Sequence, residues 1–143
     1  MISWGFLGAG WIAKTALAPA VHAAHNATLQ AVASRDHDRA KALGPHTVYE
    51  SYEDLLADPT IDAVYINLAN DQHCHWSIAA LAAGKHVLCE KPIALDYAQA
   101  QLMADAAKKY DRVLVEAVWS QWHPRFIRAV ELIQAGEIGK LTS

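Results

Sequence analysis

The chain has 143 residues, which favours one domain with a sizeable core. It is 53% hydrophobic, and its 12 basic and 15 acidic residues give a formal charge of -3. This balance argues against nucleic acid as the main partner, because a phosphate backbone requires a basic surface. Two cysteines are too few for a disulfide framework and fit a reducing compartment. With no signal peptide and no run of about 18 apolar residues, we expect a cytoplasmic protein without a membrane span.

Strand-like and helix-like segments alternate along the whole chain, and Pro19 predicts a kink or break in the first helix. This alternation is typical of βαβ units with helices on both faces of a parallel sheet. We therefore predict a doubly wound α/β Rossmann domain over 1–135, with strand order 3-2-1-4-5-6. The predicted strands are 2–7, 28–33, 47–49, 63–68, 86–90 and 112–119, and the predicted helices are 11–25, 35–43, 51–58, 71–83, 95–110 and 124–135.

The stretch GFLGAGWIAK, residues 5–14, contains the end of the first strand and the turn after it, with Gly8, Gly10 and Ala13 in the G-x-G-x-x-A pattern. Gly8 permits the tight turn, Gly10 lets a pyrophosphate approach the backbone, and Ala13 lets the helix pack close to the strand. The N–H groups at the helix start, around Trp11 and Ile12, then face the anion. The alternative is a glycine-rich turn in a plain βα unit. The context favours a dinucleotide site.

The end of the second strand indicates which dinucleotide is bound. An NAD site usually has an acidic residue there, roughly 20 residues beyond the glycines, to hold the ribose hydroxyls. Here Ser34 and Arg35 follow the strand, and a hydroxyl and a guanidinium accept a 2′-phosphate that a carboxylate repels. We predict NADP(H) over NAD(H). If the strand ends one or two residues later, Asp36 reaches the ribose and reverses this prediction.

A second constellation, Glu90-Lys91-Pro92, ends the fifth strand. Ligands of open α/β sheets lie beyond the carboxyl ends of the strands, so Glu90 and Lys91 are predicted to point into the cleft. Pro92 disfavours α geometry at Lys91. An ammonium in that cleft can orient a carbonyl or hydroxyl and stabilise oxyanion charge. The alternative is a surface lysine in a turn.

These stretches, with AVASRD, YESYEDLLADPTIDAVYI, AGKHVLCEKPIAL and GEIGKL, resemble the glucose–fructose oxidoreductase/inositol dehydrogenase family over nearly the whole chain. The E-K-P motif is the most specific element. ASRD and EAVWSQWHP resemble the branch of dihydrodiol and NADP-dependent xylose dehydrogenases. That branch usually carries Arg and an aromatic residue where this chain has Gln121 and His123.

The resemblance implies a nicotinamide-dependent dehydrogenase acting on a sugar, polyol or dihydrodiol alcohol. It implies that Lys91 is the catalytic residue and contacts the substrate hydroxyl and the nicotinamide ribose. It implies that Glu90 and Pro92 shape the cofactor cleft, around a cis Lys91-Pro92 bond. It also matches LANDQH to the loop T-P-N-x-x-H, so the cofactor-binding set includes Leu68, Ala69, Asn70 and His73, with Ala69 where proline is usual.

The resemblance further implies a second domain that covers the cleft, supplies a histidine or tyrosine acid/base residue and often makes the oligomer contact. We expect 136–143 to be the start of that missing or truncated domain, with a new strand beginning there. One alternative is a dinucleotide-binding sensor or scaffold without catalysis. Another is an S-adenosylmethionine-dependent methyltransferase, although that ligand has no pyrophosphate and gives E-K-P no role.

Several other residues have ordinary structural interpretations. His73, Cys74 and His75 do not share one helix face, so we expect no metal site. Cys89 is predicted to be a core thiol. His123 is predicted to start the last helix rather than carry protons. Trp119 and Trp122 either line the substrate cleft or cover the sheet edge; the sequence leaves these two alternatives open.

Overall fold

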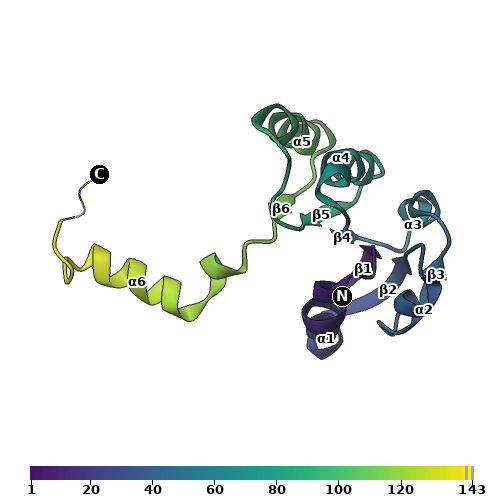
Figure 1. The fold of residues 1–143 in the computed structure, drawn as a ribbon, viewed down its shortest axis with the longest axis horizontal. Helices are drawn as coiled ribbons and strands as arrows, with labels where there is room; N and C mark the ends of the chain where they lie inside the picture. The colour runs from purple at the N-terminus through teal and green to yellow at the C-terminus, as the bar shows by residue number, and fades with distance from the viewer. Residues whose placement is uncertain (141, 143) are drawn as a thin grey trace.

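The computed structural model describes residues 1–140 and 142 and forms one parallel sheet of six strands between two layers of helices (Figure 1). The strand order is β3-β2-β1-β4-β5-β6, so the predicted fold class and strand order are confirmed. The order reverses between β1 and β4, which makes their carboxyl ends the switch point where such sheets bind ligands. The strands are β1 (Ile2–Leu7), β2 (Ala27–Ala33), β3 (Thr47–Tyr49), β4 (Ala63–Ile66), β5 (His86–Cys89) and β6 (Leu114–Glu116).

Alternation along the strands builds a separate core on each face of the sheet. On one face, the rings of Phe6 and Tyr65 pack edge-to-face with each other. Helix α1 (Ala18–Ala23) and helix α2 (His37–Lys41) contribute to the same core. Leu7 points to the other face, where the core is closed by three helices. Successive strand residues face opposite sides, so a strand buried on both faces is apolar throughout. The three helices are α3 (Tyr52–Ala57), α4 (His73–Ala82) and α5 (Tyr97–Tyr110).

The first helix does not break at Pro19. A π-helical turn, η1 (Ala13–Leu17), instead precedes α1, and Pro19 lies in the first turn of α1. Proline cannot donate a backbone hydrogen bond, and a wider turn before it accommodates that loss. Instead of the predicted kink, the helical segment that follows the glycine turn is therefore wider over Ala13–Leu17, before α1 begins.

The last predicted strand is shorter than expected. The 112–119 prediction is wrong at its end, because β6 stops at Glu116 and Trp119–Trp122 form a 3-10 helix, η3. Helix α6 (Pro124–Gln134) follows, buries no residue and points away from the sheet (Figure 1). Residues 135–138 form turns, and the strand predicted near the end includes positions 141 and 143, which lie outside the described residues.

Two helices start at side-chain caps. Ser51 Oγ accepts the Asp54 N–H at 3.0 Å, and Asp96 Oδ1 accepts the Gln99 N–H at 2.8 Å. Such caps satisfy donors that the first helical turn leaves unpaired. Among the described helices, none is both long and apolar enough to cross a membrane.

Candidate functional site

The glycine turn joins β1 to η1 at the switch point. Gly8 has a φ of +94°, and a Cβ built on it would lie 2.3 Å from the Asn67 carbonyl oxygen. Its N–H donates to Ala33 O at 2.8 Å, which ties the turn to the end of β2. Only glycine combines this backbone conformation with this closeness to β4. The tight turn predicted at Gly8 is present.

Gly10 meets a different neighbour. A Cβ on Gly10 would lie 2.9 Å from Asn67 Nδ2 and 3.1 Å from Asn67 Oδ1. The Asn67 amide therefore lies against the bare Gly10 Cα. The sequence predicted that only a pyrophosphate approaches Gly10. It did not indicate Asn67, because nothing in the local pattern places residue 67 beside residue 10.

A hollow of about 490 Å³ lies beside the glycine turn, between Gly10 and the start of α2. Ser34 and Arg35 are not among its lining residues; the basic side chains in it are Lys14 and Arg39. The hollow is lined by Ala9, Gly10, Trp11, Lys14, Asp36, Asp38, Arg39 and Ala42. Sequence reasoning missed Lys14 and Arg39, although both lie within four residues of positions that it chose.

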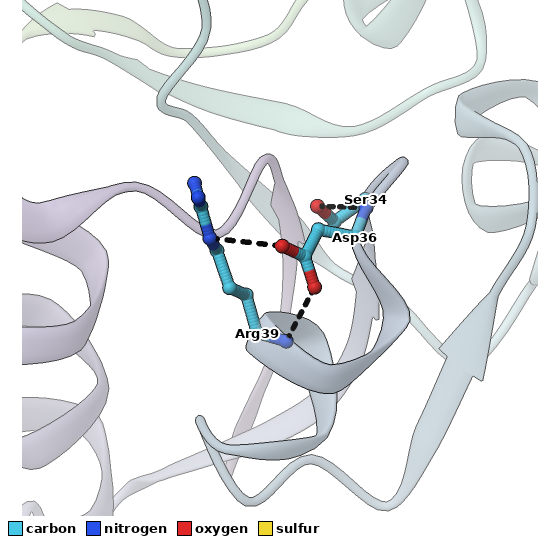
Figure 2. Close-up of polar contacts among 3 residues, drawn as sticks. All are labelled: Ser34, Asp36 and Arg39. Atoms are coloured by element: carbon cyan, nitrogen blue, oxygen red, sulfur yellow. Dashed lines mark hydrogen bonds and ion pairs between the residues drawn. The ribbon is translucent and has the colours of Figure 1, made fainter.

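The residues after β2 form a small hydrogen-bonded group (Figure 2). Ser34 is 8% exposed, and its Oγ accepts the Asp36 N–H at 3.2 Å. Asp36 caps α2 through the Arg39 N–H and forms an ion pair with Arg39 Nε at 2.9 Å. Because β2 ends at Ala33, Asp36 is the helix cap rather than the strand tip. Its charge is matched by Arg39, while Arg35 is exposed to solvent.

A cavity of about 600 Å³ lies at the carboxyl ends of β4, β5 and β6. Asn67, Leu68, Asn70 and His73 line it from the β4 side, whereas Ala69 is not among its lining residues. Ile12 lines it from the glycine turn. Glu90 and Lys91 line it from the end of β5, and the remaining lining residues are Ala16, Leu17, Leu88, Val115, Glu116, Ala117, Val118, Trp119 and Trp122.

A side chain from strand β4 supports the Glu90-Lys91-Pro92 turn. Tyr65 is fully buried, and its hydroxyl donates to Glu90 Oε1 at 2.7 Å. The other carboxylate oxygen of Glu90 accepts the Lys91 N–H at 3.1 Å. Burial first, and then this hydrogen bond to a carboxylate, raise the pKa of Tyr65 well above its usual value, so its hydroxyl stays protonated. Tyr65 thus fixes the Glu90 side chain beside Lys91.

Two further side chains hold the residues that follow Lys91. The Lys91-Pro92 peptide bond is cis, as the resemblance implied. His73 Nδ1 lies 2.8 Å from Pro92 O and its Nε2 3.2 Å from Leu68 O, so this buried ring connects two loops that line the cavity. Glu116 Oε1, at the end of β6, accepts the Ile93 N–H at 2.8 Å. Sequence reasoning missed Tyr65 and Glu116 as supports for this turn.

The Lys91 side chain is exposed, and it lines the cavity next to Glu90. Among the described residues, the ammonium has no hydrogen-bond or ion-pair partner. A protonated amine with free donors at a cavity wall can bind a hydroxyl or carbonyl oxygen. The geometry therefore leaves Lys91 available for the oxygen of a bound ligand.

Trp119 and Trp122 both line the cavity, and each is more than 70% exposed. This arrangement favours the cleft-lining alternative over cover for the sheet edge. His123 caps α6 and accepts the Arg125 N–H through Nδ1 at 3.2 Å, as predicted for a helix-starting residue. Its ring packs edge-to-face with Trp119.

The remaining candidates have structural roles. Burial raises the pKa of Cys89 to about 11, which fits the core thiol that we predicted. His73 uses both ring nitrogens within the fold, and His75 packs on Trp76. The part of the chain that the structure describes contains no group of three His, Cys, Asp or Glu side chains that could hold a metal ion.

We expect His73→Ala to lower the free energy of unfolding by about 2–3 kcal/mol, because it removes a buried ring and the N–H that this ring donates within the fold. Urea unfolding measures this loss. His75→Ala is the matched control, since His75 is exposed on the same helix; its effect is expected to stay within about 0.5 kcal/mol. Equal losses in the two variants would contradict the connecting role of His73.

Residues 2–118 match the model of the GFO/IDH/MocA oxidoreductase family, whose domain is an NAD-binding Rossmann fold. The chain belongs to this family. Sequence resemblance alone had suggested the same family, and that assignment is confirmed. The matched region is accordingly an NAD(P)-binding Rossmann domain of the kind that this oxidoreductase family contains.

Relatives within the GFO/IDH/MocA family support the suggested branch. The chain is 42% identical to the D-xylose 1-dehydrogenase (NADP(+)) 2 of Haloferax volcanii over 144 residues, covering 98% of this chain and 44% of the relative. It is 35% identical to the mouse (Mus musculus) trans-1,2-dihydrobenzene-1,2-diol dehydrogenase over 147 residues, covering 98% and 44%. A crystal structure of a mutant 3-ketoreductase from Actinomadura kijaniata with NADP and TDP-benzene superposes with a TM-score of 0.90 at 35% identity, covering 98% and 44%. The chain therefore spans less than half the length of these relatives.

Proposed function

We propose that this chain binds NADP(H), and less favourably NAD(H), and presents it for hydride transfer to or from an alcohol carbon of a sugar, polyol or dihydrodiol. The observation that supports this proposal most is the position of Gly8 and Gly10. Their turn lies at the switch point and beside the cavity that Lys91 lines. A diphosphate fits this turn, because its backbone is bare and its N–H groups open a helix.

The proposed cofactor-binding residues surround this turn and the cavity. Gly8, Gly10, Trp11 and Ile12 would hold the diphosphate through the backbone. Leu68, Ala69, Asn70 and His73 would contact the cofactor from the loop along the β4 side. Glu90 lines the end of the cavity, and Pro92 would shape the turn that follows Lys91. When bound, the nicotinamide supplies the hydride chemistry.

The proposed role of Lys91 is to orient the substrate oxygen. Its ammonium can donate to a hydroxyl or carbonyl oxygen in the cavity and stabilise negative charge that develops there. Glu90, fixed by Tyr65, keeps a carboxylate beside the Lys91 backbone and limits how the side chain leaves the turn. A proton acceptor outside this chain completes the reaction in this proposal.

The proposed preference for NADP(H) rests on the basic residues near the end of β2. Ser34 and Arg35 remain in the proposed set, and Arg39 and Lys14 join them because they line the hollow beside Gly10. A 2′-phosphate there would compete with Asp36 for the Arg39 guanidinium, which offers donors beyond the Nε used by Asp36. The NADP-dependent xylose dehydrogenases among the relatives agree with this preference.

Parallel fluorescence titrations with NADPH and NADH test this preference. We expect NADPH to bind at least about 10-fold more tightly, and Arg39→Ala to remove most of that difference by weakening NADPH alone. Arg128→Ala is the matched control, because Arg128 forms the same kind of exposed ion pair, with Glu131 at 2.9 Å. An NADH preference in the unmodified protein would reverse the 2′-phosphate argument.

The second candidate function is a dinucleotide sensor or scaffold that binds cofactor without catalysis. The exposed Lys91 at the cavity favours the dehydrogenase, since a sensor needs no group directed at a substrate oxygen. Competition between NADPH and S-adenosylmethionine tests the methyltransferase alternative, which has no use for a diphosphate turn.

We also propose that the protein works in the cytosol, where its two free cysteines stay reduced, with a sugar or polyol rather than nucleic acid as its partner.

A further inference from the structure

We propose that Asn67 is a cofactor-binding residue whose side-chain amide donates to the diphosphate of a nicotinamide dinucleotide bound at the Gly8–Gly10 turn. This assignment deepens the proposed function and rests on it. It concerns a residue that directly follows β4 in the apolar strand segment and that carries no motif of its own.

The first observation is an unpaired donor. Asn67 Nδ2 is buried, and no hydrogen-bond partner for it exists among the described residues. A buried donor without an acceptor is costly, and native folds leave few of them. The Asn67 backbone N–H is already used, because it donates to Leu7 O at 2.9 Å. The side-chain amide nitrogen is thus the donor of Asn67 that lacks a partner.

The second observation is the position of this amide. It lies against Gly10, where a Cβ would be only 2.9 Å from Nδ2, and Asn67 also lines the cavity that Lys91 lines. The amide therefore lies between the turn proposed for the diphosphate and the cavity that Lys91 lines. The terminal torsion of asparagine is broad and nearly two-fold, so the nitrogen can turn toward an acceptor in the cavity.

The third observation concerns charge. The proposed ligand is a dianionic bridge, and a neutral amide donor next to it forms a charge-assisted hydrogen bond. A carboxylate in the same place would oppose the anion. Asn67 also explains a second constraint on residue 10: a side chain there would displace the amide as well as obstruct the backbone approach of the ligand.

Calorimetric titration of the protein at its full encoded length tests this assignment with two probes, NADPH and adenosine 2′,5′-bisphosphate. The second probe contains no diphosphate bridge. We expect Asn67→Ala to weaken NADPH about 10-fold and the bisphosphate less than about twofold. Asn67→Asp, of nearly the same shape, is expected to weaken NADPH still more, with part of that loss recovered at high salt.

Asn26→Ala is the control, because Asn26 is an exposed asparagine at the opposite end of the sheet; both affinities should stay unchanged. Unchanged NADPH affinity in Asn67→Ala and Asn67→Asp, or equal losses for both probes, would overturn the assignment and leave the proposed function intact. An unmodified protein that binds neither NADPH nor NADH would overturn the proposed function and this assignment together.

Discussion

Gly8→Ala is expected to lower the free energy of unfolding by about 3–5 kcal/mol, because two separate costs add at this position. The residue has a φ of +94°, which an alanine adopts only with strain. The new methyl would also lie 2.3 Å from the Asn67 carbonyl oxygen, a backbone atom of the central strand segment that cannot rotate away. Urea unfolding followed by circular dichroism measures the loss.

Gly84→Ala separates these two costs. Gly84 also has a positive φ, +78°, but a Cβ there would meet only an Arg112 side-chain nitrogen at 3.8 Å. It should therefore show the strain alone, about 1 kcal/mol. Similar losses in the two variants would mean that β4 moves aside easily, and that the close approach of Gly8 to Asn67 does not constrain the turn.

Lys91→Ala in the full-length protein is expected to lower kcat by about 10³-fold while changing the Kd for NADPH less than about threefold. The physical reason is that the ammonium is proposed to act on the substrate oxygen, where charge changes during the reaction, and not on the diphosphate. Steady-state reduction of NADP⁺ with a panel of sugars and polyols gives kcat, and fluorescence titration with NADPH gives the Kd.

Lys108→Ala is the matched control for charge removal, since Lys108 is exposed on α5 and is not among the residues lining the cavity. Its kcat should equal that of the unmodified protein. Full activity in Lys91→Ala would remove Lys91 from the mechanism. A large loss of NADPH affinity without a separate loss of kcat would make Lys91 a cofactor ligand only.

Tyr65→Phe addresses the support of this turn. We expect a loss of about 1 kcal/mol in unfolding free energy, because one hydrogen bond to a half-buried carboxylate is removed and the ring remains. If Tyr65 positions Glu90 beside Lys91, kcat should fall more than KM changes. A kcat equal to that of the unmodified protein would restrict Tyr65 to a packing role.

The elements that sequence reasoning found are those with local signals. Ile2–Leu7 reads as a buried strand from its composition, and the glycines that follow mark its end. Gly84 and Pro124 mark helix boundaries in the same way. The alternation of such segments is enough to predict a parallel sheet, because crossover connections have one preferred hand. Predictions failed where local signals were ambiguous, as at the end of β6, where the apolar run through Trp119 continues past the last paired residue.

The chain's own residue pattern determined the Rossmann architecture, the glycine turn after β1 and the E-K-P turn after β5. Only the tertiary structure placed Asn67 against Gly10, Tyr65 on Glu90, and His73 between Leu68 and Pro92. The reason is physical. Strand and turn signals arise from neighbouring residues, whereas these contacts join residues that only the pairing of β1, β4 and β5 brings together.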